Sequence, residues 1–328
     1  MVHICYREYE IPDNRLQSFN TPYYKMISEG LTILSLFCLI VSIGFLLNGF
    51  IIITNLFWWM KRKLIETVDL LITSLGLLWL IHLVIHMHHL GLLIFHWSLF
   101  GIDNPEYVDT VTLCVMFCSL WWGSLLCVFY CVKITNYNNR LLIRLKMNIS
   151  KMVPWLLLIS LVISYLSSLP YHWSVTSTYV GNGTIGGKRT MEINVDNLFI
   201  IVFSGSIIPF KIFCVAIYFI IVSLVRHTKN MSSRGSGFSD AQRDIHLRVI
   251  WSMVIFLLFY VLYFVAHITI TLLMSVENSM LLLLCNFFIF AYPSLHSISF
   301  IISNKKLKSS FIFVFRLSWV EKLKHQTS

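Results

Sequence analysis

The sequence predicts an all-α membrane protein: a seven-transmembrane-helix bundle with its N-terminus outside and its C-terminus in the cytoplasm. The chain has 328 residues, of which 57% are hydrophobic and only 12% charged, whereas soluble domains carry about 25% charged residues. Its apolar residues gather into seven stretches, each near the length of about 20 residues that crosses a hydrocarbon core. Most of the chain is therefore expected to lie in lipid.

Helices rather than strands are expected, because an open strand cannot satisfy its backbone hydrogen bonds in lipid. The first stretch ends before Lys61, the third closes at Lys133, the fifth follows Asp196, and the seventh ends before Asn304. In chain order, the expected helices span about 31–58, 67–95, 108–134, 152–171, 197–225, 249–274 and 280–302.

These helices divide the chain into an extracellular segment at 1–30, a seven-helix domain at 31–303 and a cytoplasmic tail at 304–328. The tail mixes basic residues with Phe311, Phe313, Phe315 and Trp319. This composition is typical of a short amphipathic helix on the inner leaflet. A partly disordered basic tail is the alternative.

The orientation follows from the basic residues, which stay on the cytoplasmic side of a membrane. With the N-terminus outside, 19 of the 25 Lys and Arg residues fall in cytoplasmic segments and five in outer ones. The remaining one, Lys211, lies within the fifth helix. The sequon at Asn182 then lies outside, and Asn182 is the expected glycosylation site.

The chain is not expected to be an enzyme. Its eight cysteines have no CxxC or metal-ligand spacing, so no metal site is predicted. A retinal pump needs a lysine in the seventh helix, and none lies between Met280 and Ser303. A membrane hydrolase would need clustered metal ligands from several helices, which the sequence does not supply. No cofactor is expected.

Four segments resemble the bitter-taste (type 2) family of G-protein-coupled receptors. They are Asn48-Gly-Phe-Ile51, Phe129-Tyr-Cys-Val-Lys-Ile-Thr-Asn-Tyr137, Ile208-Pro-Phe210, and Ala291-Tyr-Pro-Ser-Leu-His-Ser297 with Asn304-Lys-Lys-Leu-Lys308. The chain also lacks the Asp-Arg-Tyr and NPxxY motifs of rhodopsin-like receptors. The related vomeronasal type 1 (pheromone) receptors are the alternative. The motif in the third helix and the Asn304 segment favour the bitter-taste family.

The resemblance implies a chemosensory receptor of the plasma membrane that binds a small bitter-type agonist and activates a gustducin or inhibitory-type heterotrimeric G-protein. The expected partners are this agonist, the G-protein and the lipid bilayer; nucleic acid is not expected, and homo- or hetero-oligomers remain an option. The family's ligand pocket corresponds to Thr112, Met116, Tyr263, Asn286 and Ile289, joined by Lys211 as a candidate. The expected G-protein-coupling residues are Tyr130, Lys133, Arg226, His227 and Lys229.

The chain departs from the family pattern at two membrane positions. Trp79 stands where the family usually has an arginine that ties helix 2 to helices 1 and 7, and Thr112 stands where it usually has a pocket tryptophan. The lock of the inactive state is therefore expected to be built differently here.

Two further features have open interpretations. Lys211 is costly at the middle of a membrane helix, and it is expected either to face the bundle, near helix 3 or an anionic ligand group, or to turn toward a wet cavity. His82, His86 and His89 share one helical face. We expect them to line a wet outer vestibule rather than to bind a metal.

Overall fold

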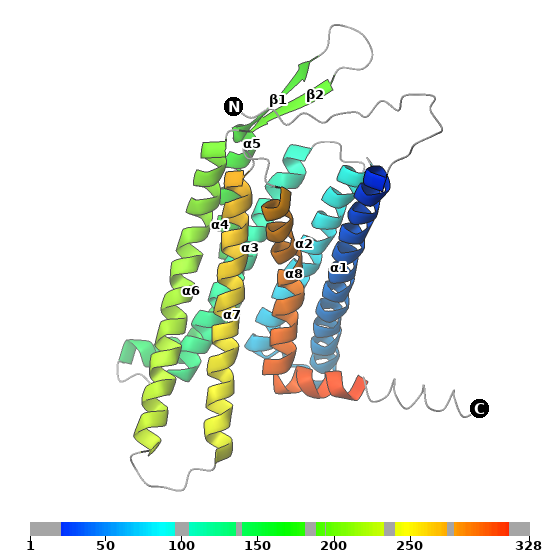
Figure 1. The fold of residues 1–328 in the computed structure, drawn as a ribbon. Coiled ribbons are helices and arrows are strands. Elements are labelled where there is room, and N and C mark those ends of the chain that lie inside the picture. Colours follow the sequence, from blue (N-terminus) through cyan, green and yellow to red (C-terminus); the bar gives the residue numbers. More distant parts are fainter. Residues whose placement is uncertain are drawn as a thin grey trace, which may run out of the picture.

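The computed structural model describes residues 21–95, 105–135, 140–180, 188–193, 195–232, 240–273 and 279–314. Within these residues, seven helices are long and apolar enough to cross a membrane, and they run side by side in one bundle (Figure 1). The predicted seven-helix architecture is confirmed. The helices are α1 (Thr21–Arg62), α2 (Thr67–Phe95), α3 (Pro105–Ile134), α4 (Arg140–Ser168), α6 (Val195–Ser232), α7 (Asp240–Leu273) and α8 (Ser279–Ser303).

Several helices are longer than the sequence analysis predicted. α2 has the expected bounds, but α1 begins at Thr21, α4 at Arg140 and α7 at Asp240, and α6 continues to Ser232. Hydropathy detects only the part of a helix that crosses hydrocarbon. The extra turns are polar or charged, so they were assigned to loops although the helical backbone continues through them.

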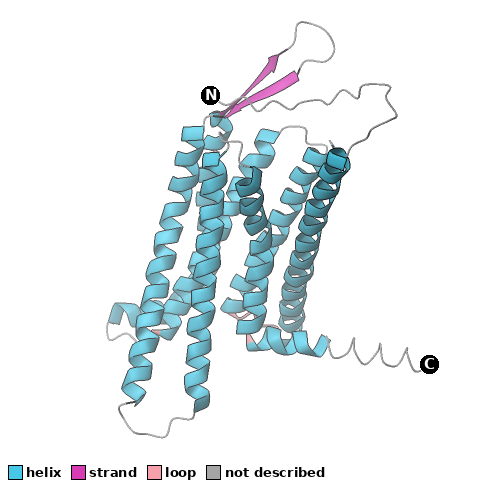
Figure 2. Ribbon diagram, viewed as in Figure 1, coloured by secondary structure: helices cyan, strands magenta, loops and turns pink. Residues whose placement is uncertain are grey.

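A β-hairpin stands outside the bundle, in the segment expected to be a loop between the fourth and fifth helices. The short helix α5 (Pro170–Ser174) leads into β1 (Val175–Val180), which pairs antiparallel with β2 (Lys188–Ile193). Figure 2 shows both strands beyond the ends of the helices, at what we call the hairpin end. Water can satisfy the open strand edges there, as lipid cannot.

The opposite end, here called the basic end, carries a further helix over residues 305–314, the tail helix. It lies across the end of the bundle, close to α1 (Figure 1). Asn304 breaks the chain direction after α8 and caps the new helix, because its Oδ1 accepts hydrogen bonds from the backbone N–H groups of Lys306 (2.9 Å) and Leu307 (3.3 Å). The helix expected after the seventh span is therefore present.

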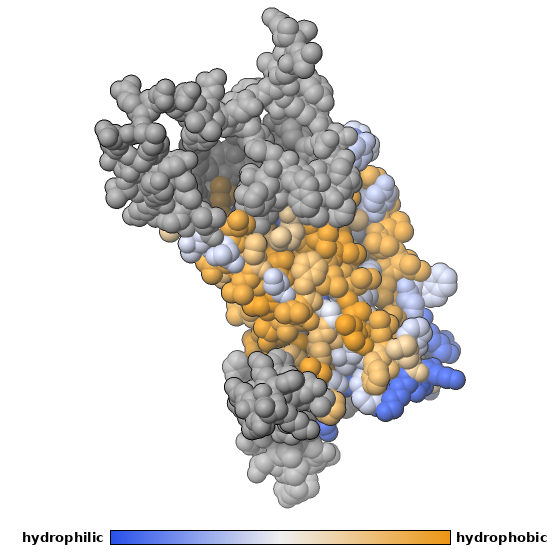
Figure 3. Space-filling view, turned by 90° about the vertical axis from the view of Figure 1, so that its right-hand side faces the viewer, coloured by the Kyte–Doolittle hydropathy of each residue, from blue (hydrophilic) through white to orange (hydrophobic). Residues whose placement is uncertain are grey.

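The outside of the bundle is apolar. Exposed side chains such as Leu46, Ile53 and Trp155 are each more than two-thirds exposed. Figure 3 shows the resulting apolar belt over the middle of the visible face, with hydrophilic side chains gathered toward the basic end. Such a surface is stable only when lipid covers it, and the chain is accordingly a multi-pass membrane protein.

Inside the bundle, a few hydrogen bonds join helices that are distant in sequence. Ser297 Oγ of α8 donates to Asn48 Oδ1 of α1 at 2.8 Å. Ser124 Oγ of α3 donates to the carbonyl of Pro209 in α6 at 2.7 Å. Each such bond stabilises a membrane bundle by about 0.6 kcal/mol, so packing has to supply most of the remaining stability.

Close packing between α3 and α6 depends on Gly205. A Cβ atom at this position would lie 2.5 Å from the ring of Phe117, which is fully buried. We predict that Gly205→Ala destabilises the bundle by about 1–3 kcal/mol, as overpacking does in other cores. The thermal unfolding temperature of the purified protein measures this effect. Gly49→Ala is the matched control, because nothing lies within 4 Å of its added Cβ. Equal unfolding temperatures for the two variants would contradict the prediction.

Candidate functional site

A cluster of aromatic rings fills the centre of the bundle between α2, α7 and α8. Trp79 of α2 is 1% exposed. Its ring centroid lies 4.9 Å from that of Tyr292, 5.7 Å from that of His296 and 6.1 Å from that of Tyr263. Tyr263 and Tyr292 stack at 4.3 Å. Edge-to-face and stacked pairs of this kind each add about 0.5–1.5 kcal/mol beyond their buried area. Trp79 therefore ties α2 to α7 and α8 by packing.

The ring contacts continue from this cluster into α6. Phe213 of α6 stacks on Tyr260 of α7 at 4.3 Å and on Phe256 at 5.1 Å. Phe256 in turn lies 4.3 Å from the ring of His296 in α8. Rings in contact thus link α2, α8, α7 and α6 through the middle of the bundle.

Three predicted ligand residues lie in the same buried core. Met116 of α3, Tyr263 of α7 and Ile289 of α8 are at most 3% exposed and belong to one packed cluster. Each lies 10 or 11 residues from the hairpin end of its helix, or about 15 Å along the helix axis. They therefore lie at matching depths below the hairpin end, within one packed core.

The two polar ligand candidates lie nearer the hairpin end. Thr112 and Asn286 are half-buried, and each lies seven residues from the start of its helix. Thr112 Oγ1 donates to the carbonyl of Val108 at 2.8 Å, and Asn286 Nδ2 donates to the carbonyl of Leu282 at 2.9 Å. The Oδ1 atom of Asn286 is a further polar atom that can accept a hydrogen bond.

Lys211 lies apart from the other candidates. Its side chain is exposed, because the opposite face of α6 carries the buried Ser206, Phe213 and Ile217. It also lies 16 residues from the start of α6, deeper than the rest. The expectation that Lys211 faces the bundle does not agree with this placement.

His82 of α2 does not line an open vestibule. His82 is 1% exposed and packs against Trp79 and Tyr263 at centroid distances of 5.8 and 6.1 Å. The ring of His86 is half-buried and lies 4.0 Å from that of His82, so these two residues share one face. The side chain of His89 lies outside the described residues. Within the described part of the chain, no group of His, Cys, Asp or Glu is arranged to hold a metal ion.

A hydrogen bond holds the base of the hairpin against α3. The hydroxyl of Tyr171 in α5 donates to Asp109 Oδ2 at 2.7 Å, and the rings of His172 and Tyr107 lie 5.1 Å apart. The described cysteines are all free thiols. Polar and ring contacts therefore make the connection between this loop and α3 that a disulfide makes in many receptors.

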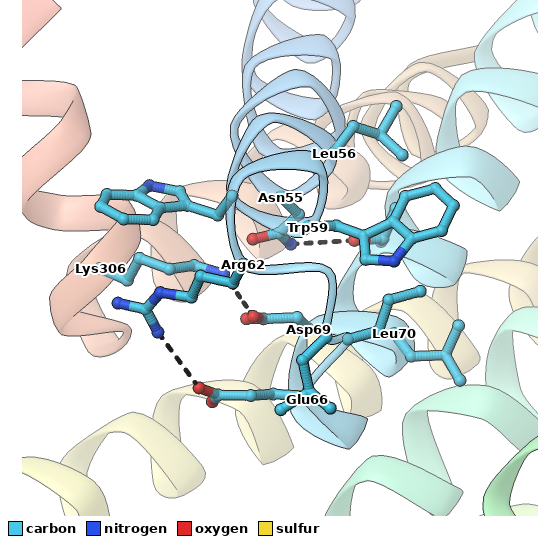
Figure 4. Close-up of a pocket in the computed structure, with 12 residues that line it drawn as sticks. Asn55, Leu56, Trp59, Arg62, Glu66, Asp69, Leu70 and Lys306 are labelled. Atoms are coloured by element: carbon cyan, nitrogen blue, oxygen red, sulfur yellow. Dashed lines mark hydrogen bonds and ion pairs between the residues drawn. The ribbon is translucent and has the colours of Figure 1, made fainter.

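At the basic end, polar contacts surround a small cavity between α1, α2 and the tail helix (Figure 4). Lys306 of the tail helix forms an ion pair with Asp69 of α2. Asn55 Nδ2 donates to Thr73 Oγ1 at 2.9 Å. The cavity has a volume of about 130 Å³. The family-like Asn304 motif thus serves to cap the tail helix and to anchor it on α2.

The predicted G-protein-coupling residues lie at the same end of the bundle. Tyr130 is half-buried in α3, whereas Lys133 and Arg226 are exposed. Lys133 Nζ donates to the carbonyl of Lys146 at 3.3 Å and so also ties α3 to α4. His227 and Lys229 belong to α6, but their side chains fall outside the described residues, as does Asn182.

Comparison with known proteins matches residues 26–319 to the family "Taste receptor protein (TAS2R)". The chain belongs to the type 2 taste receptor family. The receptor is 30% identical over 293 residues to the human "Putative taste receptor type 2 member 33", covering 85% of this chain and 93% of the relative. It is 30% identical to "Taste receptor type 2 member 64" of Pan paniscus, with 87% and 92% covered. It is 27% identical to "Taste receptor type 2 member 9" of Macaca mulatta, with 84% and 90% covered.

Family membership confirms that the chain is a plasma-membrane chemosensory receptor and not an enzyme. Much of the aromatic cluster is not among the residues predicted from the sequence. The receptor's Tyr292, His296 and Phe300 recur at every fourth residue of α8, and Phe256, Tyr260 and Tyr263 recur on one face of α7. That spacing was the available signal.

The ion pair between Lys306 and Asp69 should stabilise the basic end, because both side chains are more than four-fifths buried. We predict that Asp69→Asn and Lys306→Gln each lower the free energy of unfolding by about 1–3 kcal/mol, the cost of leaving a buried polar group without its partner. The double variant should lose less than the sum of the two. Thermal unfolding of the three variants measures the coupling, and strict additivity would contradict it.

Proposed function

We propose that the receptor binds a small, partly apolar agonist in the hairpin-end half of the bundle, among α3, α6, α7 and α8. The observation that carries this proposal is the matching depth of the candidate residues. Met116, Ile289 and the ring of Tyr263 supply an apolar floor, to which the Tyr263 hydroxyl adds one polar group. Thr112 and Asn286 supply further polar groups about one turn closer to the hairpin end. A mostly apolar site with a few polar groups is the usual form of a small-molecule site.

Agonist binding acts by shifting an equilibrium between two states of the bundle. An agonist that binds the active state better than the inactive one raises the active population by its difference in affinity. In the active state, the basic ends of α6 and α7 move apart. Phe213, Phe256 and Tyr260 join these helices by ring stacking, so their packing has to change in this step.

The basic end then receives a gustducin or inhibitory-type heterotrimeric G-protein, and phospholipase-driven calcium release is the output. Tyr130, Lys133 and Arg226, with His227 and Lys229 of α6, form the coupling surface. Two of these side chains, Lys133 and Arg226, are exposed and cationic, which suits a partner surface that carries acidic groups.

A calcium assay with a gustducin-chimeric G-protein and a panel of bitter compounds tests both the proposed agonist site and the proposed coupling surface. Tyr263→Phe and Asn286→Leu should raise the half-maximal agonist concentration about three- to tenfold, the effect of losing one hydrogen bond. The double variant Lys133→Gln/Arg226→Gln should have a lower maximal response and an unchanged affinity for the agonist.

Matched controls separate these effects from damage to folding. Tyr218→Phe removes a hydroxyl from an exposed tyrosine of α6, and Lys151→Gln removes an exposed charge from the basic end of α4. Both should respond like the unaltered receptor. Lys211→Leu should also keep its agonist potency, because Lys211 is exposed on the outside of α6. Unchanged potency in the Tyr263 and Asn286 variants, at normal surface expression, would exclude this site.

We also propose that the N-terminus is extracellular and that Asn182 carries an N-linked glycan. The excess of bases on the other side of the membrane supports this orientation. Treatment with an N-glycosidase should lower the mass of the receptor, and Asn182→Gln should abolish that shift. Modification of Asn230 instead would reverse the topology.

A further inference from the structure

An apolar groove runs between α1 and the tail helix, away from the proposed ligand site and coupling surface. Its volume is about 410 Å³. Ile53 and Phe57 of α1 and Phe313 and Val314 of the tail helix form its walls, and each is more than half exposed. The groove is therefore open on the side of the bundle that faces lipid.

Contacts with the bundle fix the position of the tail helix and so the shape of the groove. Phe311 meets Phe50 of α1 edge to face, with ring centroids 5.3 Å apart. Leu307 is fully buried in the core, and Lys306 is paired with Asp69 of α2. These three contacts hold the tail helix against the bundle and so define the groove.

One rim of the groove is cationic. Trp58 lines the groove, and its ring centroid lies 5.4 Å from Lys61 Nζ and 4.8 Å from the guanidinium carbon of Arg62. Lys308 is exposed and directly precedes Ser309 and Ser310, which line the groove from the tail helix.

The charges around the groove are unbalanced. Between residues 61 and 69 and between 305 and 308 there are six basic residues and two acidic ones. Both acids already have cationic partners, Glu66 with Arg62 at 3.6 Å and Asp69 with Lys306. The surplus is positive, so a ligand that suits this rim carries negative charge.

We propose that this groove binds a membrane phospholipid with an anionic head group. One acyl chain lies between Phe57 and Phe313, and the head group lies against Lys61, Arg62 and Lys308, with the two serines as hydrogen-bond donors. An acyl chain suits the apolar walls, and a free phosphate would leave them uncovered. A zwitterionic lipid fills the groove equally well but gains less at the rim, since each nearby base strengthens binding to anionic lipid about fivefold.

The experiment uses the full-length receptor in detergent micelles and a phosphatidylserine with a photoreactive acyl chain. Cross-links should map to α1 and the tail helix. Unlabelled phosphatidylserine should displace the probe at least about fivefold better than phosphatidylcholine, and inorganic phosphate should not displace it. Equal displacement by the two lipids, displacement by phosphate alone, or cross-links confined to other helices would overturn the proposal.

Variants separate the groove from general charge effects. Lys61→Gln with Lys308→Gln should weaken phosphatidylserine about fivefold per charge removed and leave phosphatidylcholine unchanged. Arg144→Gln with Lys151→Gln is the matched control, because it removes the same charge from exposed positions of α4. An equal loss in the control pair would overturn the site. Ser310→Trp, which fills the groove, should abolish cross-linking at an unchanged unfolding temperature; cross-linking that persists in this variant would also count against the groove.

Discussion

The middle of a bilayer contains no water, so every backbone amide there must find its hydrogen-bond partner within the chain. This constraint makes the seven spans helical and leaves side chains alone to join them. Hydrophobic burial gives little help, since lipid tails are as apolar as leucine. The helices are therefore joined by close approach, as at Gly205 against Phe117, by isolated hydrogen bonds such as Ser297 to Asn48, and above all by aromatic rings.

At Trp79, where the resemblance to the family predicted an arginine, ring packing joins α2 to α8 and also to α7. An arginine would hold α2 by charge and hydrogen bonds, whereas Trp79 holds it by ring contacts with Tyr292 and His296. Packed rings have discrete arrangements, because an interior packed this closely does not deform continuously. Contacts that run from Tyr263, beside the proposed agonist, to Phe213 in α6 are thus suited to switch together when the proposed activation separates α6 from α7.

The basic end combines several roles in a short piece of sequence. Asn304 ends α8 and caps the tail helix, Lys306 pairs with Asp69, and Leu307 enters the core. Each of the three residues thus fixes a different contact of the tail helix. The same anchoring creates the groove that we assign to an anionic lipid. The roles of topology signal, structural anchor and lipid site are compatible here, because a positive charge near the membrane surface serves all three.

The sequence by itself determined that most of the chain lies in lipid, how many helices span the membrane, and the family. These follow from the length of apolar stretches and from local motifs, which are properties of short segments. The sequence also placed Met116, Tyr263 and Ile289 on helices where they lie at matching depth. Only the tertiary structure decided which way side chains point. Lys211 proved exposed and His82 buried, although both lie on clearly predicted helices, because rotation about a helix axis is set by packing against neighbours. The β-hairpin and the full length of α4 and α6 also escaped prediction, since hydropathy detects only the hydrocarbon-crossing part of the chain.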